Sequence, residues 1–458
     1  MNMRVEADSI GSRHVPTDAY YGVQSLRGAE NFRITGHRLR PEFIISIAQI
    51  KKACAICNHA VGELDIVQRD AIITACDEII SGKFHDQFLC DPIQGGAGTT
   101  ANMNANEVIA NRAIEILGGG KGDYSIVHPN DHVNRAQSTN DVIPTAAKLT
   151  TAKLLKKAIV QVTRLRDALF AKEREFHNVI KMGRTQMQDA VPIRLGTEFG
   201  AYGRAISRDV KRMEQALEEM YDINLGGTAI GTALNANPAY VEQLAPTLSK
   251  ICQLPLKKAE DLVDGTQNLD SFAYVSATLK TCAISCSKIA NDLRLMSSGP
   301  RCGFEEINLP PMQNGSSIMP GKVNPVIPEV MSQAAFCIIG NDMTITMAAE
   351  AGQLELNYSE PVLYHKLFES LVALNGAVKT FVDNCIVGIT ANPERCRELV
   401  DSSVGVITAI CPKLGYKESA DIAKTAIATG ESVRDVLKSK QILSENEIDN
   451  LLNPEGMV

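Results

Sequence analysis

The chain has 458 residues, which is too long for one hydrophobic core and predicts two or three domains. Of these residues 45% are hydrophobic and 22% charged, a composition typical of a globular protein. Its formal net charge of −7 argues against nucleic acid as a partner, because nucleic-acid binding requires a basic surface. No uninterrupted apolar stretch approaches the roughly 18 residues of a membrane span, and the N-terminus lacks the apolar segment of a signal peptide. We therefore expect a cytoplasmic protein with no membrane partner.

Residues 1–139 combine short helical patterns with a dense run of Gly, Asn, Thr and Ser, which predicts a mainly helical N-terminal domain. Cys54 and Cys57 form a C-x-x-C pair within a helical pattern, but no second pair completes a zinc site. The twelve cysteines are therefore expected to be reduced, and this pair to be buried or half-buried thiols. Gly118–Gly122 follows a helical pattern and has no strand before it, which predicts a helix C-cap and turn.

Long amphipathic helices dominate residues 140–394. Apolar residues recur there at alternating spacings of three and four, which places them on one stripe of a helix. The stripes are Leu155, Ile159, Val162, Leu165 and Leu169; Ile206, Val210, Met213, Leu217 and Met220; and Phe272, Val275, Leu279, Cys282, Cys286, Ile289, Leu293 and Met296. Two further patterns lie near 327–351 and 362–383. Five long helices predict a central bundle, either monomeric or oligomerising through helix faces.

Residues 395–458 predict a small helical C-terminal domain, because short helical patterns alternate with turn signals such as Gly415 and Asn453-Pro454. The whole chain is thus expected to be mainly α, with three domains.

Four stretches interrupt the helical patterns with small polar residues. They are Gln94–Thr100, Gln137–Asp141, Gly183–Asp189 and Gly315–Asn324. Each offers backbone N–H groups beside hydroxyl or amide side chains, the materials of carboxylate and oxyanion sites, although a single loop of this kind is more often a cap or turn. A phosphate-binding loop is excluded at the fourth stretch, because its glycine spacing is one residue too long and Val323 replaces the Ser/Thr that binds magnesium.

The segment Gly315–Pro325, GSSIMPGKVNP, resembles the signature of the aspartase/fumarase superfamily. The likeness continues along nearly the whole chain, at Asp18–Gly22, Gln94–Thr99, Asn130–Asn134, Gln137–Asp141, Gly183–Thr185 and Gly227–Thr232. The resemblance implies a mainly α, three-domain subunit with a long central five-helix bundle, a homotetramer, active sites built from three subunits, and no organic cofactor. We see no cluster of metal ligands in the sequence and expect no bound metal.

Within the superfamily, the segments Ala348–Leu356, Glu360–Val362, Pro325–Glu329 and Asp189–Pro192 resemble the aspartate ammonia-lyases. Gln186 agrees, because class II fumarases generally carry His at that position. The aspartase branch implies reversible deamination of L-aspartate to fumarate and ammonia; the alternatives are fumarase activity on malate, or a catalytically silent structural relative.

Family members remove a proton from a carbon next to a carboxylate and expel the group on the adjacent carbon. The negative charge flows into that carboxylate, so the site must supply donors and positive charge to an aci-carboxylate dianion. The resemblance implies Ser316 as the base and Lys322 with Asn324 as the stabilising groups. Residue types alone do not choose between Ser316 and Ser317.

The resemblance also implies which residues bind the rest of the substrate. The second carboxylate would contact Thr99, Ser138, Thr185 and Ser317, and the ammonium group would contact Asn140 with Thr99 and Thr139. Gln186 cannot act as an acid, which suits an amine leaving group that already carries its proton.

Two other features of the sequence qualify this interpretation. His132 either takes part in the chemistry or orients its loop, and His128, Asp131 and His132 are not expected to bind metal, because Pro129 interrupts a helix there. The chain also departs from the family pattern, with Ala233 in place of Gly and with Tyr358 and Ser359 where Val and Met are usual.

Overall fold

The computed structural model describes residues 2–458, and these form helices joined by loops and four two-stranded sheets. The chain divides into two compact units, each built from three stretches. Unit 1 comprises residues 1–159, 212–280 and 337–373, and unit 2 comprises residues 160–211, 281–336 and 374–458.

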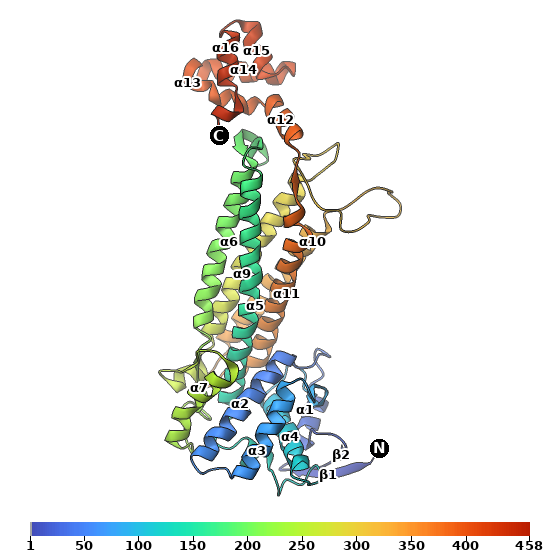
Figure 1. The fold of residues 1–458 in the computed structure, drawn as a ribbon, viewed down its shortest axis with the longest axis vertical. Helices are drawn as coiled ribbons and strands as arrows, with labels where there is room; N and C mark the ends of the chain where they lie inside the picture. Colours follow the sequence, from blue (N-terminus) through green and yellow to red (C-terminus); the bar gives the residue numbers. More distant parts are fainter. Residues whose placement is uncertain (1) are drawn as a thin grey trace. The chain divides into compact units, whose positions relative to one another are not determined.

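Five long helices pass through both units, and they confirm the predicted bundle. They are α5 (Thr139–Glu175), α6 (Leu195–Glu218), α9 (Asp270–Met296), α10 (Val326–Glu350) and α11 (Glu360–Asn384). Within each unit their segments lie side by side (Figure 1). In unit 1 the Ser276 hydroxyl of α9 donates to Asp342 Oδ1 of α10 at 2.7 Å, and in unit 2 the Tyr202 hydroxyl of α6 donates to Asp292 Oδ2 of α9 at 2.8 Å.

The apolar stripes predicted from the sequence lie on the buried faces of these helices. All eight residues of the stripe that begins at Phe272 are buried, and so are those of the stripe that begins at Ile206. Cys54 and Cys57 are buried as free thiols, as predicted, and burial raises the pKa of Cys57. One described stretch, Glu360–Gly388, is long and apolar enough to cross a membrane, a test that core helices of bundles also pass.

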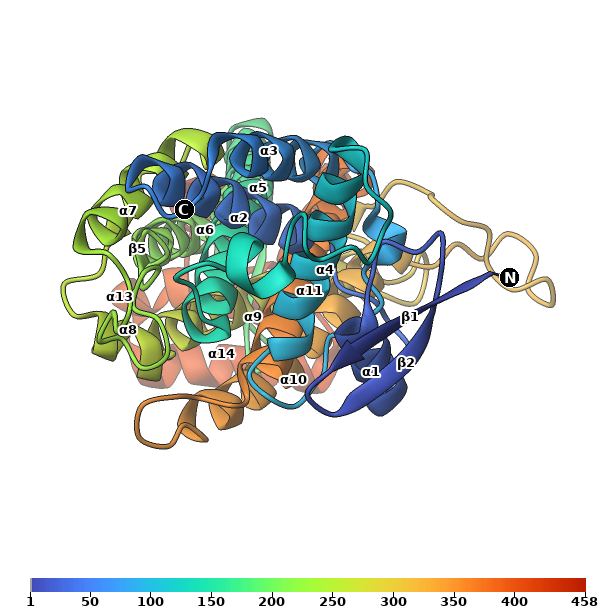
Figure 2. The ribbon, with the colours of Figure 1, turned by 90° about the horizontal axis from the view of Figure 1, so that it is seen from below.

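Unit 1 opens with a hairpin and a layer of shorter helices. These are β1 (Met3–Asp8), β2 (Gly11–Pro16), α1 (Val23–Asn31), α2 (Pro41–Ala60), α3 (Ile66–Ile80) and α4 (Thr99–Ile116). The strands pair antiparallel from Met3 opposite Pro16 to Asp8 opposite Gly11. Helix α2 packs against α3, α3 against α4 and α4 against α1 (Figure 2). Gly118 follows α4 with a φ of 83°, which confirms the predicted C-cap turn.

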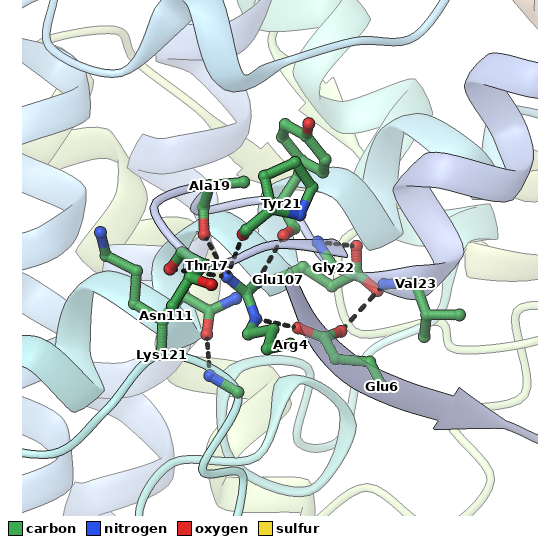
Figure 3. Close-up of polar contacts among 12 residues, drawn as sticks. Arg4, Glu6, Thr17, Ala19, Tyr21, Gly22, Val23, Glu107, Asn111 and Lys121 are labelled. Atoms are coloured by element: carbon green, nitrogen blue, oxygen red, sulfur yellow. Dashed lines mark hydrogen bonds and ion pairs between the residues drawn. The ribbon is translucent and has the colours of Figure 1, made fainter. Parts of the chain in front are cut away.

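The motif Asp18–Gly22 joins the hairpin to α1 and is held by buried charges (Figure 3). Arg4 donates to the carbonyl oxygens of Ala19 and Tyr21 at 2.8 and 2.9 Å. Glu107 of α4 accepts from the Gly22 N–H at 2.8 Å. A Cβ at Gly22 would lie 2.6 Å from a carboxylate oxygen of Glu6, so only glycine fits. This part of the family pattern therefore serves folding rather than chemistry.

The remaining elements of unit 1 are short. They are the helical turns η1 (His85–Gln87) and η2 (Pro129–Val133), the parallel pair β5 (Asp222–Ile223) and β6 (Lys257–Lys258), and helices α7 (Pro238–Cys252) and α8 (Leu262–Gln267).

Unit 2 adds a hairpin and a C-terminal helical layer to its part of the long helices. Its elements are β3 (Ile180–Thr185), β4 (Gln188–Arg194), β7 (Ile307–Asn308), β8 (Thr390–Ala391), α12 (Pro393–Ser402), α13 (Cys411–Leu414), α14 (Tyr416–Thr429), α15 (Val433–Lys440), α16 (Glu445–Leu451) and the turns η3 (Ile386–Gly388), η4 (Val404–Ala409) and η5 (Pro454–Gly456). Ile180 and Met182 of β3 pack into one apolar core with Val400, Ile410 and Leu437 of the C-terminal layer. That core anchors the hairpin.

Candidate active site

The N-termini of α4 and α5 meet in unit 1 and bring four of the predicted residues together. Thr99 is the first residue of α4, and Ser138 directly precedes Thr139, the first residue of α5. Asn102, one turn into α4, donates to the Thr139 hydroxyl oxygen at 3.3 Å. Several first-turn N–H groups are already paired: Thr99 donates to the Gly96 carbonyl, Ala101 to Gln94 Oε1 and Asn140 to Ser138 Oγ. The positive ends of the two helix dipoles still favour an anion at this point. We call this cluster of Thr99, Ser138, Thr139 and Asn140 the binding half-site.

Glycine makes the close approach of the two helices possible. Gly98 has a φ of +87°, and a Cβ there would lie 2.9 Å from the side chain of Ile143 on α5. The Thr99 side chain that follows is exposed, and its hydroxyl donates to the Gly96 carbonyl at 2.7 Å. Its hydroxyl oxygen therefore keeps a lone pair at an exposed position.

A buried carboxylate, Asp141, fixes the backbone on both sides of the binding half-site. One oxygen accepts from the Ser138 N–H at 2.9 Å, and the other accepts from the N–H groups of Gly226 and Thr228 at 3.0 and 3.1 Å. Burial raises the pKa of Asp141 to about 6, against the three N–H donors, which lower it. The segment after Gln137 and the loop after Leu225 thus depend on one ionised side chain.

Asn140 is positioned by the same loop, and its side-chain oxygen is left as a free acceptor. Its side-chain Nδ2 donates to the Ala229 carbonyl at 2.7 Å, and its backbone carbonyl accepts from Asn224 Nδ2 at 3.0 Å. Within residues 2–458 no donor reaches Asn140 Oδ1. An amide oxygen held in place at the half-site suits an ammonium group, which has only donors.

Lys51 is a supporting residue that the sequence analysis missed. Its side chain is fully buried in α2, and Nζ donates to Asn134 Oδ1 at 2.7 Å and to Gln137 Oε1 at 2.9 Å. Burial lowers its pKa to about 8. The signal was a lysine inside the apolar stripe of a helix, next to Ile47 and Cys54, where a charge is tolerated only with specific partners.

Thr185 and Gln186 lie at the turn of the β3–β4 hairpin in unit 2. Thr185 pairs with Gln188, so Gln186 and Met187 form a two-residue turn, with φ values of 52° and 64°. Such turns normally contain Asn or Gly, so two longer side chains there carry backbone strain. Thr185 and Gln186 are both exposed at the tip of the hairpin.

The arginine of the Gly183–Thr185 motif holds this hairpin rather than facing solvent. Arg184 Nη1 lies 2.7 Å from Glu306 Oε1, and Glu306 is fully buried. Lys181 contacts the other oxygen of Glu306 at 3.0 Å. At the far strand the Ser403 hydroxyl donates to Asp189 at 2.6 Å. Buried ion pairs and the C-terminal layer therefore fix the base of the hairpin and leave its tip free.

The segment Gly315–Asn324 forms an exposed loop before α10, drawn without helix or strand in Figure 1. Its neck is closed by an antiparallel bridge between Asn314 and Val323. A Cβ at Gly315 would lie 1.9 Å from the Lys322 carbonyl oxygen, so the neck requires glycine. The loop carries Ser316, Ser317 and Lys322 in exposed positions and Asn324 in a half-buried one. We call it the catalytic loop, after the role that the sequence analysis predicts for Ser316 and Lys322.

Ser316 has one backbone donor on its side-chain oxygen. The Ile318 N–H donates to Ser316 Oγ at 3.3 Å, in a turn closed by the Met319 N–H donating to the Ser316 carbonyl at 3.1 Å. A donor at that position stabilises a developing alkoxide. No carboxylate or imidazole contacts Ser316 in the part of the chain described by the structure.

His132 makes a structural hydrogen bond in the η2 turn. Its Nδ1 accepts from the His128 N–H at 2.8 Å, and His128 Nδ1 accepts from the N–H groups of Asn130 and Asp131 at 3.2 and 3.1 Å. Burial lowers the pKa of His132. Pro129 begins a π-helical turn here instead of ending helical structure, and both imidazoles are engaged with the backbone.

The departures from the family pattern have local structural consequences. Ala233 adopts a φ of 55°, a left-handed conformation that favours glycine. Tyr358 is exposed in the turn before α11, and the Ser359 N–H donates to Asn357 Oδ1 at 2.8 Å. Of the predicted site residues, Thr99, Ser138, Thr139 and Asn140 lie in unit 1, while Thr185, Gln186, Ser316, Ser317, Lys322 and Asn324 lie in unit 2.

Two family profiles match the chain. The family described as Lyase matches residues 11–340, and the family described as Fumarase C C-terminus matches residues 406–458. Together they include the binding half-site, the tip of the β3–β4 hairpin, the catalytic loop and most of the C-terminal helical layer.

Curated relatives match over nearly the whole chain. It is 54% identical to the aspartate ammonia-lyase of Bacillus subtilis (strain 168), over 99% of this chain and 96% of that one. It is 45% identical to the aspartate ammonia-lyase of Escherichia coli (strain K12), over 100% and 96% of the two chains.

Solved structures share the fold. A fumarate lyase:delta crystallin of Brucella melitensis bound to cobalt is 48% identical, with a TM-score of 0.96 over 100% of this chain and 99% of that one. A class II fumarase of Schistosoma mansoni is 34% identical, with the same TM-score and coverage. The fold is therefore common to both branches of the superfamily, and the choice between substrates depends on the site.

Proposed function

Because the chain belongs to the aspartate ammonia-lyase family and is a carbon–nitrogen lyase, we propose that it converts L-aspartate reversibly to fumarate and ammonia. The observation that carries the proposal is its identity of 45–54% to aspartate ammonia-lyases over 99–100% of its length. All the segments of the predicted site lie inside the matched region.

The chemistry of the site supports ammonia rather than water as the leaving group. Expulsion of hydroxide from malate requires a proton donor next to the leaving oxygen, whereas an ammonium group leaves as neutral ammonia. Gln186, at the tip of the β3–β4 hairpin, has no acidic proton to give. The free acceptor of Asn140 suits a group that carries only donors.

Ser316 acts as the base in the proposed reaction. Its alkoxide takes the proton from the carbon next to the side-chain carboxylate of aspartate, and the C–H electron pair moves into that carboxylate. Lys322, Asn324 and the N–H groups of the catalytic loop stabilise the aci-carboxylate dianion that results. The Ile318 N–H, which already donates to Ser316 Oγ, lowers the cost of forming the alkoxide.

Collapse of this intermediate completes the elimination. The electron pair returns from the carboxylate to form the carbon–carbon double bond, and the carbon–nitrogen bond breaks with its electrons leaving on ammonia. The proton held by Ser316 then passes to ammonia or solvent and regenerates the base. The other carboxylate stays bound by Thr99, Ser138, Thr185 and Ser317.

We further propose a homotetramer in which each active site combines three subunits. One supplies the binding half-site, a second the tip of the β3–β4 hairpin, and a third the catalytic loop. Apolar residues of α10 support assembly through helix faces: Phe336, Met343 and Met347 are 62–65% exposed and follow one stripe of the helix. An isolated subunit would therefore be inactive, which a dilution series combined with sedimentation analysis can test.

The first test is the absorbance of fumarate after the protein is mixed with L-aspartate and, separately, with L-malate. Fumarate from aspartate alone supports the proposal. Fumarate from malate alone would contradict it and leave a fumarase. If neither substrate yields fumarate and the protein sediments as a tetramer, the protein would be a catalytically silent relative.

A further inference from the structure

Two histidines and a carboxylate come together in unit 1, and none of the three belongs to the binding half-site. The cavity that His365 lines also contains Gly98 and Ile143, which flank that half-site. His365 and Glu369 are one helical turn apart, and His37 comes from the loop that precedes α2. His365 Nε2 lies 3.4 Å from Glu369 Oε1. One possible ligand atom from each of the three residues lies within 4.8 Å of the other two.

These separations are close to those of a metal site. Ligand atoms roughly 2.0–2.2 Å from a tetrahedral zinc ion lie roughly 3.4 Å from one another. The His365–Glu369 pair already has this separation. Because His37 is exposed on a loop, a rotation of its side chain can shorten its distance to the other two.

His365 has the properties of an imidazole ligand. Its side chain is 8% exposed, and it lines an apolar cavity with Phe43 and Phe368. A neutral imidazole keeps the lone pair that a metal requires, and apolar surroundings strengthen the attraction of a cation to the carboxylate.

The loop that carries His37 is fixed by a buried aspartate. Asp91 accepts from the N–H groups of Ile34, Thr35 and Gly36 at 2.7–3.1 Å. The Thr35 hydroxyl oxygen then accepts from the His37 N–H at 3.0 Å. The backbone of His37 is thus held in place by contacts that do not use its imidazole, and the ring remains available to bind an ion.

Glu369 divides its two oxygens between two partners. Lys366 Nζ donates to Oε2 at 2.7 Å, while Oε1 faces His365. The lysine therefore orients the carboxylate and leaves one oxygen for a ligand bond. The half-exposed position of Glu369 gives an ion access from solvent.

We propose that His37, His365 and Glu369 bind one divalent transition-metal ion of the Zn²⁺ or Co²⁺ type, with water completing the coordination. Two imidazoles and one carboxylate suit these ions, whereas Mg²⁺ and Ca²⁺ prefer oxygen ligands alone. The ion fastens the loop before α2 to α11. No step of the proposed lyase reaction passes through this site.

The test uses the full-length protein, stripped of metal with a chelator and dialysed. Co²⁺ is added while its visible ligand-field absorption is followed, and Zn²⁺ binding is measured by calorimetry. We expect one equivalent per chain and a cobalt spectrum of low coordination number. His37→Ala changes only an exposed side chain, so its folding is not at risk. It should weaken binding at least as much as loss of an outer-shell partner does, roughly 10–100-fold.

Three further variants decide the assignment. Glu369→Gln keeps the shape of the side chain but removes its charge, and it should weaken binding like His37→Ala. His14→Ala, at an exposed histidine of β2, and His132→Ala, in the η2 turn, should leave affinity unchanged. The proposal is overturned if no stoichiometric binding occurs, if His37→Ala and Glu369→Gln both retain native affinity, or if binding is lost only in His132→Ala.

Discussion

The binding half-site and the catalytic loop are built in opposite ways. In unit 1, Asp141 and Lys51 are buried charges that hold the helix N-termini through several hydrogen bonds. In unit 2, Ser316 and Lys322 are exposed on a loop closed by one isolated bridge. The groups expected to recognise the substrate are therefore preorganised, whereas the groups expected to move its proton sit where a segment can open and close.

The glycines of the two regions show the same contrast. Gly98 is required by close packing, because a side chain would meet Ile143. Gly321 has a φ of +86° and no atom within 4 Å of the position of a Cβ, so it is required for its backbone conformation alone. Gly98 therefore allows close packing at the binding half-site, whereas Gly321 allows a left-handed backbone in the exposed catalytic loop.

The largest effect is expected from Ser316→Ala. Loss of the proposed base should lower kcat roughly 10²–10⁴-fold, with little change in KM, because the binding half-site is untouched. The exposed position of Ser316 predicts unchanged folding, which circular dichroism can verify. Fumarate release from L-aspartate measures both constants.

Ser317→Ala is the matched control for this substitution. It should mainly raise KM, since Ser317 is expected to bind a carboxylate. If Ser317→Ala loses kcat and Ser316→Ala keeps it, the base has been assigned to the wrong serine.

Gly315→Ala tests whether the shape of the catalytic loop matters. The new methyl group would collide with the Lys322 carbonyl and open the neck, so kcat should fall by about 10²-fold through misplacement of Ser316 and Lys322. Gly321→Ala is the control: it meets no atom and adds only the strain of a left-handed residue, roughly 1–2 kcal/mol. Equal losses in the two variants would show that backbone freedom, not the neck, limits the loop.

Asp141→Asn tests whether the binding half-site is preorganised by one charge. The amide can still accept on one side, but its NH₂ group faces an N–H donor, which costs about 1–3 kcal/mol of stability. We expect kcat/KM to fall about tenfold, with KM carrying most of the change. A variant with native KM would show that the segments containing Ser138 and Thr228 keep their conformation without the charge of Asp141.

The pH dependence follows from the raised pKa of Asp141. In the folded protein Asp141 protonates as the pH falls through about 6. The native enzyme should therefore lose kcat/KM below that pH. The pH profile of Asp141→Asn should not show this acidic decrease. Stability has the opposite sign. Because the pKa is above its ordinary value of 3.8, ionisation disfavours folding, and the contribution of Asp141 to stability increases as the pH falls from 6 towards 4. Parallel losses of activity and stability would contradict this.

Periodicity was enough to predict the long helices, because each buries one continuous apolar stripe such as that from Phe272 to Met296. The polar stretches were also recognisable, since small residues interrupt those stripes. What each side chain does was harder to predict. Arg184 holds a buried carboxylate from a distant segment, and Lys51 supports a turn in another part of the chain.

The cluster of His37, His365 and Glu369 shows why such features escape sequence reasoning. His365 and Glu369 have the spacing of one helical turn, which is a weak signal by itself. His37 joins them only because the fold brings its loop to α11. Contacts between distant segments depend on tertiary packing, which periodicity does not specify.

The smallest effect concerns strain in the loop beside the binding half-site. Ala233 has a φ of 55°, and its N–H donates to the Gly227 carbonyl at 2.9 Å. Ala233→Gly relieves a left-handed penalty of roughly 1–2 kcal/mol but gives the unfolded chain more freedom, so we expect a net gain of about 0.5–1 kcal/mol. Urea unfolding measures it. Ala236→Gly, nearby at an ordinary φ, should instead destabilise by a similar amount. If both variants destabilise the protein, the left-handed conformation of Ala233 carries no strain that glycine could relieve.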